Sequence, residues 1–249
     1  MADATPENLQ RDLEESRVRE RNEQLRHDEE LRQFAYAISH DLREPLRMVG
    51  SYSQLLSRRY ESQLDDEGRE FLRYIQDGVQ RMDSMLRDVL TYSHHLHALD
   101  QPLSTVNAEA ALEGVLLTLE KAIHESGARI THDPLPELTF DFAQLTQLFR
   151  QLIANSLKFH GAEPPVIHVS SEETEDQVTF SVRDNGIGID PRYHEQIFGV
   201  FKRLHRDEYP GNGMGLAIVK RIVTQHGGKV WVESQTGAGA TFRFTLPRG

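Results

Sequence analysis

The stretch Phe34-Ala-Tyr-Ala-Ile-Ser-His40-Asp-Leu-Arg-Glu-Pro45-Leu-Arg decides the fold of the first part of this chain. Around it, large apolar residues recur at intervals of three and four, which predicts the buried stripe of a long helix. This stripe consists of Leu31, Phe34, Ile38, Leu42, Pro45, Val49, Tyr52 and Leu56. At about 100° per residue, His40 projects about 160° away from it. Pro45 removes a backbone N–H inside the same helix, so we predict a solvent-facing histidine beside a bend.

Composition and charge exclude several classes of function. The 249 residues include 38% hydrophobic and 27% charged side chains, as in ordinary globular domains. A net charge of -11 would repel nucleic acid, and the lack of cysteine excludes disulfides and cysteine-ligated zinc. No apolar run approaches the roughly 18 residues of a membrane span, and the start does not resemble a signal peptide. We expect a soluble, cytoplasmic chain that binds neither nucleic acid nor membrane.

Two long helices are predicted in the first hundred residues. The first could extend from Leu9 to Tyr60, about 75 Å at 1.5 Å per residue. After the polar residues 61–68, a second helix carries a stripe complementary to the first, made of Leu72, Ile75, Val79, Met82, Leu86, Val89 and Leu96. A single hairpin would cover only part of each stripe, whereas a second copy would complete a four-helix bundle. We therefore predict a homodimer.

The pattern divides the chain into three parts. Residues 1–30 are dense in Glu, Asp and Arg, which is typical of a solvated charged helix or of a coiled-coil signalling helix below an upstream sensor. Residues 31–100 form the helical dimerisation domain. Residues 101–249 mix short strands with helices, which gives the whole chain an α+β fold. The predicted helices of this last part span 107–125, 141–159 and 216–225, and the strands 103–106, 129–132, 137–140, 166–170, 177–183, 229–234 and 241–246.

The predicted helix 141–159 has two distinct faces. Its apolar side would be buried, while its other side carries amides and one cation where exposed helices usually carry Glu and Lys. The polar side consists of Gln144, Gln147, Gln151, Asn155 and Lys158. Amides in a row favour hydrogen bonding to a ligand, and an ordinary exposed face is the alternative.

Two glycine-rich segments follow this helix. Asp184-Asn-Gly186-Ile-Gly188 comes directly after a predicted strand, and its glycines would let the backbone approach a ligand closely, with a plain turn as the alternative. Gly211-Asn-Gly213-Met-Gly215-Leu216 opens a helix, whose free N–H groups and positive dipole end suit a phosphate. Neither the G-x-G-x-x-G dinucleotide fingerprint nor a Walker A sequence occurs in the chain.

In this order the motifs resemble those of sensor histidine kinases of two-component systems. The run from His40 to Arg47 is similar to their phosphoacceptor H-box, in the form common in the phytochrome-type branch. Asn155 matches the N-box, Phe198 and Phe201 match the F-box, and the two glycine segments match the first and second glycine boxes. The resemblance implies a helical-hairpin dimerisation domain followed by a Bergerat-type α/β sandwich that binds ATP.

The resemblance also implies which residues bind ATP and Mg²⁺. Asp184 would accept a hydrogen bond from the adenine amine, the side-chain oxygen of Asn155 would bind Mg²⁺, and Lys158 would hold phosphates with the start of the last helix. A lid over the triphosphate would consist of Lys202, Arg203, His205 and Arg206. The implied nucleotide-binding set is Asn155, Lys158, Asp184, Gly186, Gly188, Phe198, Phe201, Lys202, Arg203, Gly211, Gly213, Gly215, Leu216 and Thr241.

By the same resemblance, the γ-phosphoryl group of ATP would pass to His40 and then to an aspartate of a response-regulator receiver domain. The family assigns Asp41 as the carboxylate that orients the imidazole, whereas helix geometry favours Glu44, which shares the face of His40. Many family members have Thr or Asn in place of Glu44, and Asn in place of Gln151. The alternative functions are a weakly catalytic or phosphatase-biased dimeric scaffold and a non-kinase ATPase of the same fold.

The receiver domain would dock on the first helix, below His40. Arg47, Ser51, Leu55 and Arg58 fall within about 60° of His40 around the helix. Leu55 would be an apolar anchor between arginines, which would also steer the acidic site of a receiver. Packing of Leu55 against the second helix is the alternative.

Overall fold

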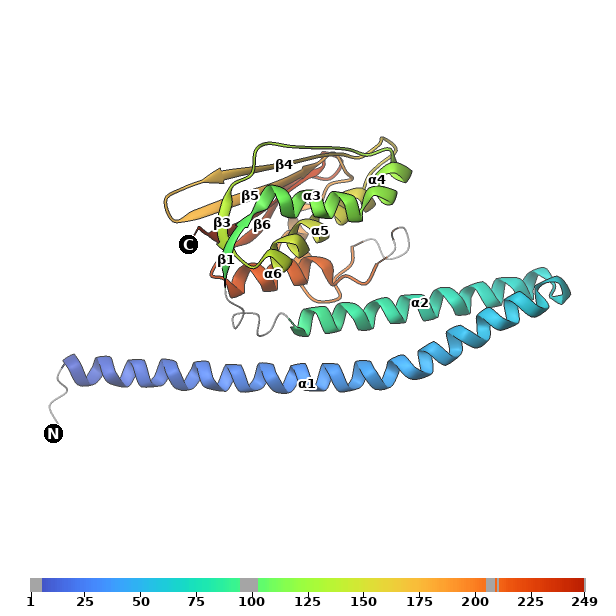
Figure 1. Ribbon diagram of the computed structural model, residues 1–249, viewed down its shortest axis with the longest axis horizontal. Helices are drawn as coiled ribbons and strands as arrows, with labels where there is room; N and C mark the ends of the chain where they lie inside the picture. Colours follow the sequence, from blue (N-terminus) through green and yellow to red (C-terminus); the bar gives the residue numbers. More distant parts are fainter. Residues whose placement is uncertain (1–5, 95–102, 205–208, 210, 249) are drawn as a thin grey trace. The chain divides into compact units, whose positions relative to one another are not determined.

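The computed structural model describes residues 6–94, 103–204, 209 and 211–248, with side chains before residue 94 described for residues 29 and 33–93. The chain divides into two compact units, Met1–His97 and Ala98–Gly249 (Figure 1). The first is a helical hairpin and the second an α/β sandwich with a mixed sheet, which confirms the predicted fold class. Each unit is described by itself.

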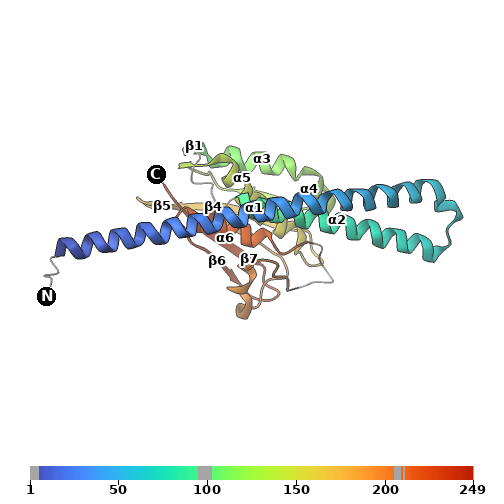
Figure 2. The ribbon, with the colours of Figure 1, turned by 90° about the horizontal axis from the view of Figure 1, so that it is seen from below.

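The hairpin consists of α1 (Pro6–Tyr60), a short 3₁₀ turn η1 (Glu61–Gln63) and α2 (Asp66–His94). Pro45 lies inside α1 without ending it. Figures 1 and 2 show α1 as one continuous helix that bends in its second half, the half that contains Pro45. The predicted length of the first helix and the predicted bend are therefore both present.

Small residues form the contact between α1 and α2. A Cβ atom at Gly50 would lie only 3.1 Å from Val79 Cγ1, and the Gln76 amide donates to the Ser53 carbonyl at 3.3 Å. Ser39 and Ser53 are both buried. Glycine and serine let the two helices approach closely along this flank, and Val79 of the predicted α2 stripe takes part in the contact.

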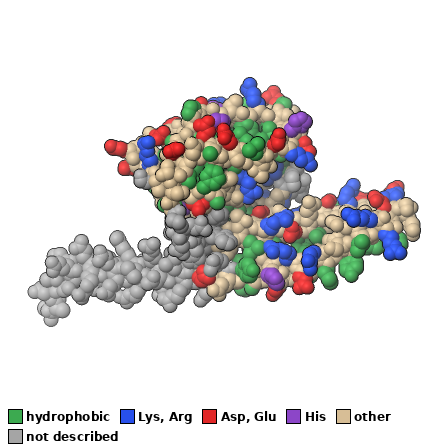
Figure 3. All heavy atoms as spheres, in the orientation of Figure 1, with side chains coloured by type: hydrophobic (Ala, Val, Ile, Leu, Met, Phe, Trp, Pro, Cys, Tyr) green, Lys and Arg blue, Asp and Glu red, His purple; other side chains and the backbone are tan. Residues whose placement is uncertain are grey.

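The apolar stripe of α1 stays open, which differs from the complementary pairing with α2 that the sequence predicts. Its exposed fractions range from 40% for Ile38 to 64% for Phe34 and Tyr52. On α2, Phe71, Ile75 and Met82 are exposed as well. Figure 3 shows hydrophobic side chains on the surface of this helical unit. Leu72, Val79, Leu86 and Val89 of the predicted α2 stripe are half-buried, so the hairpin leaves the described part of the α1 stripe and only part of the α2 stripe free for another partner.

The second unit contains a five-stranded sheet and a separate two-stranded ribbon. The sheet has the order β2-β4-β5-β7-β6, with β2 (Arg129–His132) parallel to β4 (Val166–Glu173) and the other pairs antiparallel. The remaining strands of the sheet are β5 (Gln177–Asp184), β6 (Val230–Ser234) and β7 (Ala240–Pro247). The ribbon pairs β1 (Ser104–Asn107) with β3 (Glu137–Phe140).

Helices cover one face of this sheet (Figures 1 and 2). They are α3 (Ala108–Thr118), α4 (Glu120–Ser126), α5 (Phe142–Lys158) and α6 (Gly215–Gln225), so the helix predicted over 107–125 is interrupted at Leu119. The side chains of Asn107 and Asp141 accept hydrogen bonds from the N-terminal N–H groups of α3 and α5. Both residues therefore cap the helices that follow them.

Aromatic rings hold α5 against the middle of the sheet. Phe149 of α5 lies 5.5 Å from Phe180 and 6.2 Å from Phe244, measured between ring centroids. Phe180 and Phe244 are cross-strand partners that stack at 5.1 Å. All three side chains are fully buried. This packing fixes the polar side of α5 relative to the C-terminal end of β5, where Asp184 lies.

Candidate functional site

Asp184 is held by three hydrogen-bond donors at the end of β5. Its Oδ1 accepts from the Gly186 N–H at 2.9 Å and from the Ala240 N–H at 3.1 Å. Its Oδ2 accepts from the Ser156 hydroxyl at 2.9 Å. An ionised carboxylate has about four lone-pair sites, so one acceptor position on Oδ2 is left for a ligand. The sequence reasoning missed Ser156 and Ala240, although Ser156 directly follows Asn155 on α5.

Gly186 and Gly188 serve close contacts inside the protein, which differs from the ligand approach predicted for them. A Cβ atom at Gly186 would collide with the Phe159 carbonyl oxygen, and one at Gly188, where φ is 69°, with the Gln235 carbonyl oxygen. The Ile187 N–H donates to the same Phe159 oxygen at 3.0 Å. These contacts tie the loop after Asp184 to the end of α5.

The predicted row of amides on α5 separates into two groups. Gln144 is only 2% exposed, and its Oε1 is 2.9 Å from Nε2 of His226. Burial lowers the pKa of His226. Gln147 accepts from Arg150 at 2.7 Å. Gln144 and Gln147 thus contact the protein itself, and Gln144 was wrongly placed on an exposed face. It is buried because α6 ends against the start of α5.

Gln151 and Asn155 lie instead beside the first residue of α6. An ideal Cβ at Gly215 would be 2.7 Å from Gln151 Oε1 and 3.8 Å from Asn155 Nδ2, so glycine makes room for both amides. Met214 provides no side-chain cap for α6. The first N–H groups of α6, at Gly215 and Leu216, are therefore not occupied by a capping side chain, as an anion site at a helix start requires.

The glycine segment before α6 folds onto the start of the predicted lid. Gly213 has φ 72°, and a Cβ there would be 2.6 Å from the Lys202 carbonyl oxygen. Phe201, which precedes Lys202, has φ 57° although it is not glycine. Left-handed backbone is unfavourable for phenylalanine, so the contact with Gly213 holds a strained turn in place.

The predicted F-box and lid residues differ in burial. Phe198 is 6% exposed and belongs to the core, so it supports the segment from inside, whereas Phe201 and Lys202 are exposed. The Arg203 guanidinium donates to the Tyr209 carbonyl at 2.7 Å. His205 and Arg206 lie outside the described residues.

Lys158 lies next to this segment at the end of α5. Its Nζ is 4.0 Å from the centre of the Phe159 ring, and a Cβ at Gly211 would lie 2.9 Å from that Nζ. Burial lowers the pKa of Lys158 to about 8, and the positive charge of Arg203 acts in the same direction. An anion bound here would restore the ammonium form.

Thr241 faces away from Asp184. In β7, Ala240, Phe242 and Phe244 are buried on the helix side of the sheet, so Thr241 projects to the opposite face by strand alternation. Its cross-strand neighbours are Arg183 and Glu233. The contact with Asp184 comes from the backbone of the preceding residue, Ala240, rather than from the predicted threonine.

On the hairpin, His40 is exposed and touches a carboxylate. Its Nδ1 lies 3.2 Å from Asp41 Oδ1, and the two side chains are 69% and 82% exposed. Among the residues that the structure describes, Asp41 rather than Glu44 contacts the ring. Neighbouring helical residues do not normally face each other, so this contact depends on the Asp41 side chain turning toward the ring.

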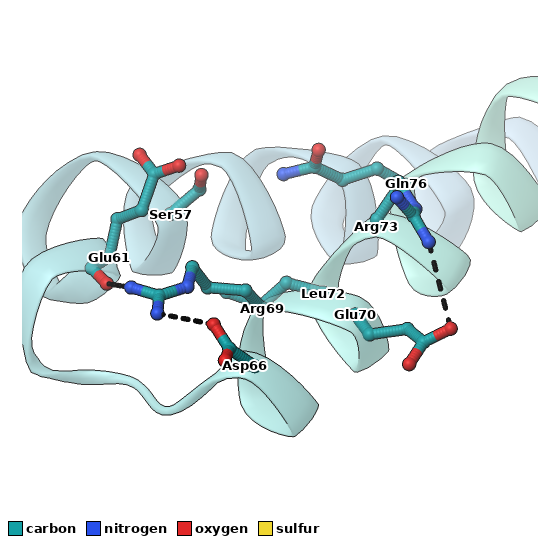
Figure 4. A pocket seen from close by; sticks show the side chains of 8 residues that line it. All are labelled: Ser57, Glu61, Asp66, Arg69, Glu70, Leu72, Arg73 and Gln76. Carbon is teal, nitrogen blue, oxygen red and sulfur yellow. Dashed lines mark hydrogen bonds and ion pairs between the residues drawn. The ribbon is translucent and has the colours of Figure 1, made fainter.

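A polar hollow of about 530 Å³ lies at the closed end of the hairpin (Figure 4). Arg69 crosses it and donates to the Glu61 carbonyl and to Asp66, and Arg73 pairs with Glu70. These α2 side chains lie about 120–180° around the helix from Ile75. Leu72, which belongs to the predicted α2 stripe, also lines the hollow, so the hollow borders that stripe while its charged α2 side chains lie away from it. It is lined by Ser57, Glu61, Asp66, Arg69, Glu70, Leu72, Arg73 and Gln76.

Within the described ranges, no helix is both long enough and apolar enough for a membrane span. In the same ranges, His, Cys, Asp and Glu side chains do not gather in groups of three or more that could hold a metal ion.

Two family matches cover most of the chain. Residues 30–98 match the His Kinase A (phospho-acceptor) domain, and residues 140–249 match the histidine kinase-, DNA gyrase B- and HSP90-like ATPase family. The first match contains His40 and Asp41, and the second contains every residue placed around Asp184 and α6. The two families thus divide the chain between a phosphoacceptor and an ATPase.

Several relatives carry the same pair of regions. Cyanobacterial phytochrome A of Nostoc is 52% identical over 91% of this chain and 30% of its own length. The phytochrome-like protein Cph1 of Synechocystis is 43% identical over 90% of this chain and 30% of its own length. This chain thus spans about a third of the length of these relatives.

Solved structures show the same fold. Full-length ShkA in complex with AMPPNP has a TM-score of 0.68 and 29% identity, over 86% of this chain and 45% of that one. The Acinetobacter baumannii histidine kinase AdeS has a TM-score of 0.60 and 18% identity, over 84% of this chain and 98% of that one. The first of these two was solved with a nucleotide analogue.

Proposed function

This chain belongs to the sensor histidine kinases, and from that premise we propose that it uses ATP to phosphorylate His40 and passes the phosphoryl group to a response regulator. The observation that carries the proposal is the exposed His40 ring, whose Nδ1 lies 3.2 Å from Asp41. An ionised carboxylate only accepts hydrogen bonds, so Nδ1 carries the proton. The lone pair of Nε2 is then available as the nucleophile.

In the proposed step, Nε2 of His40 forms a bond to the γ-phosphorus of ATP. The bond from that phosphorus to the oxygen bridging the β- and γ-phosphates breaks, and ADP leaves with the electron pair. The imidazole gains positive charge as the N–P bond forms. Asp41, beside Nδ1–H, stabilises that charge and can take the proton, with Glu44 as its rival one turn further along α1.

The ATP site would be built from the end of β5, the polar side of α5 and the start of α6. Asp184 offers its free acceptor position to the adenine amine, and Lys158 and the α6 N-terminus offer positive charge to the phosphates. The structure of ShkA with AMPPNP supports nucleotide binding by a relative with this fold.

The amides of Gln151 and Asn155 fit Mg²⁺. Side-chain amide oxygens are hard, neutral ligands, and Mg²⁺ in kinases takes few protein ligands because phosphate and water complete its shell. Asn155 would bind the ion, with Gln151 one turn before it. When bound, the ion would neutralise charge that develops on the phosphates.

Titration of Lys158 predicts a pH-dependent affinity for ATP. With a pKa of about 8, its protonated fraction falls about eightfold between pH 7.5 and pH 9, and affinity should fall by a similar factor. Binding of ATP at several pH values, followed by calorimetry, measures this. Lys158→Arg keeps the charge and should flatten the profile; a wild-type profile that is flat from pH 7.5 to 9 would contradict the assignment.

The same pKa shift has a defined sign for stability. The ordinary pKa of a lysine is 10.5, so between about pH 8 and 10.5 the unfolded chain binds more protons at residue 158 than the folded chain. The Lys158 contribution to the free energy of unfolding therefore rises with pH across that window. Opposite directions for nucleotide affinity and for stability distinguish this titration from general alkaline unfolding.

We also propose that the hairpin dimerises. The described part of the α1 stripe, together with Ile75 and Met82 of α2, stays exposed because the contact between α1 and α2 runs largely along small residues. A second hairpin could cover both stripes and form the predicted four-helix bundle. The match to the His Kinase A domain supports this arrangement.

The response regulator would dock beside the hollow at the closed end of the hairpin. Leu55 is 56% exposed, so it is available for contact and does not pack inside the hairpin. Arg47 and Arg58 flank it on the face of α1 that carries His40, and that face lies away from the apolar stripe of α1. An apolar anchor rimmed by cations suits an acidic receiver surface.

Leu55→Asp should slow transfer to a receiver by at least about tenfold, or ~1.4 kcal/mol, because it removes the anchor and repels acidic side chains. Self-labelling and dimerisation should stay at wild-type level. The assay follows loss of label from the kinase to a receiver that the wild-type chain phosphorylates. Leu117→Asp, at a leucine of α3 that is 73% exposed, is the matched control. A Leu55→Asp protein that no longer dimerises would assign Leu55 to the core instead.

One labelling experiment separates the proposed kinase from its alternatives. The chain is incubated with γ-labelled ATP and Mg²⁺, and the label on protein is tested for stability in acid and base. A kinase acting on histidine gives acid-labile, base-stable label. Release of phosphate without protein label would indicate a plain ATPase. If the chain neither becomes labelled nor releases phosphate, the dimeric scaffold is the remaining alternative.

The input to this kinase would come through α1. The phytochrome relatives extend well beyond the matched region, so we propose that an upstream sensor domain, or a regulatory partner, acts on the charged helix 6–30. Its continuity with the segment that carries His40 would transmit movement, and Pro45 would provide the flexible point.

A further inference from the structure

Tyr209 connects two parts of the proposed ATP site. Its ring packs on Phe159, with 5.1 Å between the ring centroids, and its hydroxyl donates to the His160 carbonyl at 3.2 Å. Its own carbonyl accepts from Arg203 at 2.7 Å. The end of α5 and the start of the lid thus meet at one residue.

The same Phe159 ring also supports Lys158. The Lys158 ammonium lies 4.0 Å from the ring centre and fills the space that a Cβ atom at Gly211 would need. Gly211 comes only two residues after Tyr209, and α6 begins four residues after Gly211. A tyrosine fixed on Phe159 therefore limits where the segment Gly211–Gly215 can lie relative to Lys158.

We propose that Tyr209 is a positioning residue for ATP, which docks on the end of α5 and thereby holds the glycine segment and Lys158 at the spacing that binds the triphosphate. The proposal rests on the proposed kinase function and concerns the same site. Tyr209 would act through Phe159, Lys158 and the glycine backbone rather than by contact with the reacting atoms. The ring contact would carry most of this role, and the polar bond to His160 would fix the orientation of the ring.

The test compares Tyr209→Ala and Tyr209→Phe in the full chain. ATP binding is measured by calorimetry, and initial rates of autophosphorylation are measured over a range of ATP concentrations. Tyr209→Ala should raise both Kd and KM for ATP about tenfold and leave the rate at saturating ATP within about twofold of wild type. Tyr209→Phe keeps the ring contact and should recover most of the affinity.

Tyr193→Ala is the control, at another half-buried tyrosine of the same unit, and should leave Kd and KM unchanged. The midpoints of thermal unfolding, measured without nucleotide, should be the same for all variants, since the proposed role of Tyr209 is in binding ATP. Wild-type affinity in Tyr209→Ala, or a lower saturating rate at unchanged KM, would overturn the inference. Failure of the wild-type chain to bind ATP would instead contradict the proposed function, so the two failures are distinguishable.

Discussion

Replacement of His40 by glutamine is expected to lower the autophosphorylation rate at least about 10³-fold, which corresponds to a loss of ~4 kcal/mol of transition-state stabilisation. Glutamine has similar length and polarity but no nucleophilic ring nitrogen. The His40 side chain is 69% exposed, so the fold and the hairpin should tolerate the change. Phosphorylation with labelled ATP measures the rate, and ATP affinity should stay at the wild-type value.

The matched control is His168→Gln. His168 also lies beside a carboxylate, with Nε2 3.4 Å from Asp133 Oδ2, and it is partly exposed on the sheet. It lacks the helical setting and the family motif of His40, so its loss should leave labelling unchanged. Label at wild-type level in His40→Gln would contradict the assignment of His40 as the sole phosphorylation site. It would direct attention to the cluster His94, His95 and His97, whose side chains lie outside those described.

Asp184→Asn is the second prediction with a large expected effect. Asn keeps an Oδ1 for the N–H groups of Gly186 and Ala240, and Ser156 can turn its hydroxyl to the Leu152 carbonyl, 3.2 Å away. The fold should therefore persist. The amide that replaces Oδ2 donates instead of accepting, so it would oppose the adenine amine, and ATP affinity should fall about 10- to 150-fold, or about 1.5–3 kcal/mol.

Calorimetric titration with ATP checks this, with Asp190→Asn as the control. Asp190 is also a carboxylate that follows β5, but on the protein surface it accepts hydrogen bonds from Arg192. These hydrogen bonds hold the pKa of Asp190 at about 2. Asn155→Ala should behave differently from Asp184→Asn, losing Mg²⁺-dependent transfer while retaining adenine recognition. Unchanged ATP affinity in Asp184→Asn would remove the adenine role of that carboxylate.

Periodic apolar residues made much of the fold predictable. The series through Leu42 indicated a long helix, and the alternation of Val178, Phe180 and Val182 indicated a strand, since apolar residues repeat with the period of each element. The resemblance to the sensor histidine kinases followed from motifs in order, and the family matches confirm that family. The predicted helix starts at residues 107 and 141 coincide with the observed caps Asn107 and Asp141.

Contacts between distant segments were not predictable in this way. Helical spacing gave no reason to expect Gln144 against His226, because the distance between them depends on how α6 crosses α5. For the same reason Gly186 and Gly188 were assigned to a ligand, whereas they make room for the carbonyls of Phe159 and Gln235. A glycine in a sequence indicates a close approach but does not identify the group that approaches.

Side-chain direction was the other limit. Thr241 follows the glycine turn that leads back to Asp184, yet strand alternation turns it to the opposite face and leaves Ala240 to make the contact by its N–H. On the hairpin, spacing alone favoured Glu44 over Asp41, since residues four apart share a face. The rotation of the Asp41 side chain toward Nδ1 depends on torsion angles that a residue pattern does not contain.

The position of the phosphoryl group on the His40 ring tests the central claim most directly. After reaction with ATP and Mg²⁺, the chain with ¹⁵N-labelled histidine is examined by heteronuclear NMR, which distinguishes the two ring nitrogens. Because Asp41 contacts Nδ1, the account predicts one phosphohistidine, at residue 40, with phosphorus on Nε2 and a proton retained on Nδ1. Phosphorus on Nδ1 of His40, or on any residue other than His40, would contradict it.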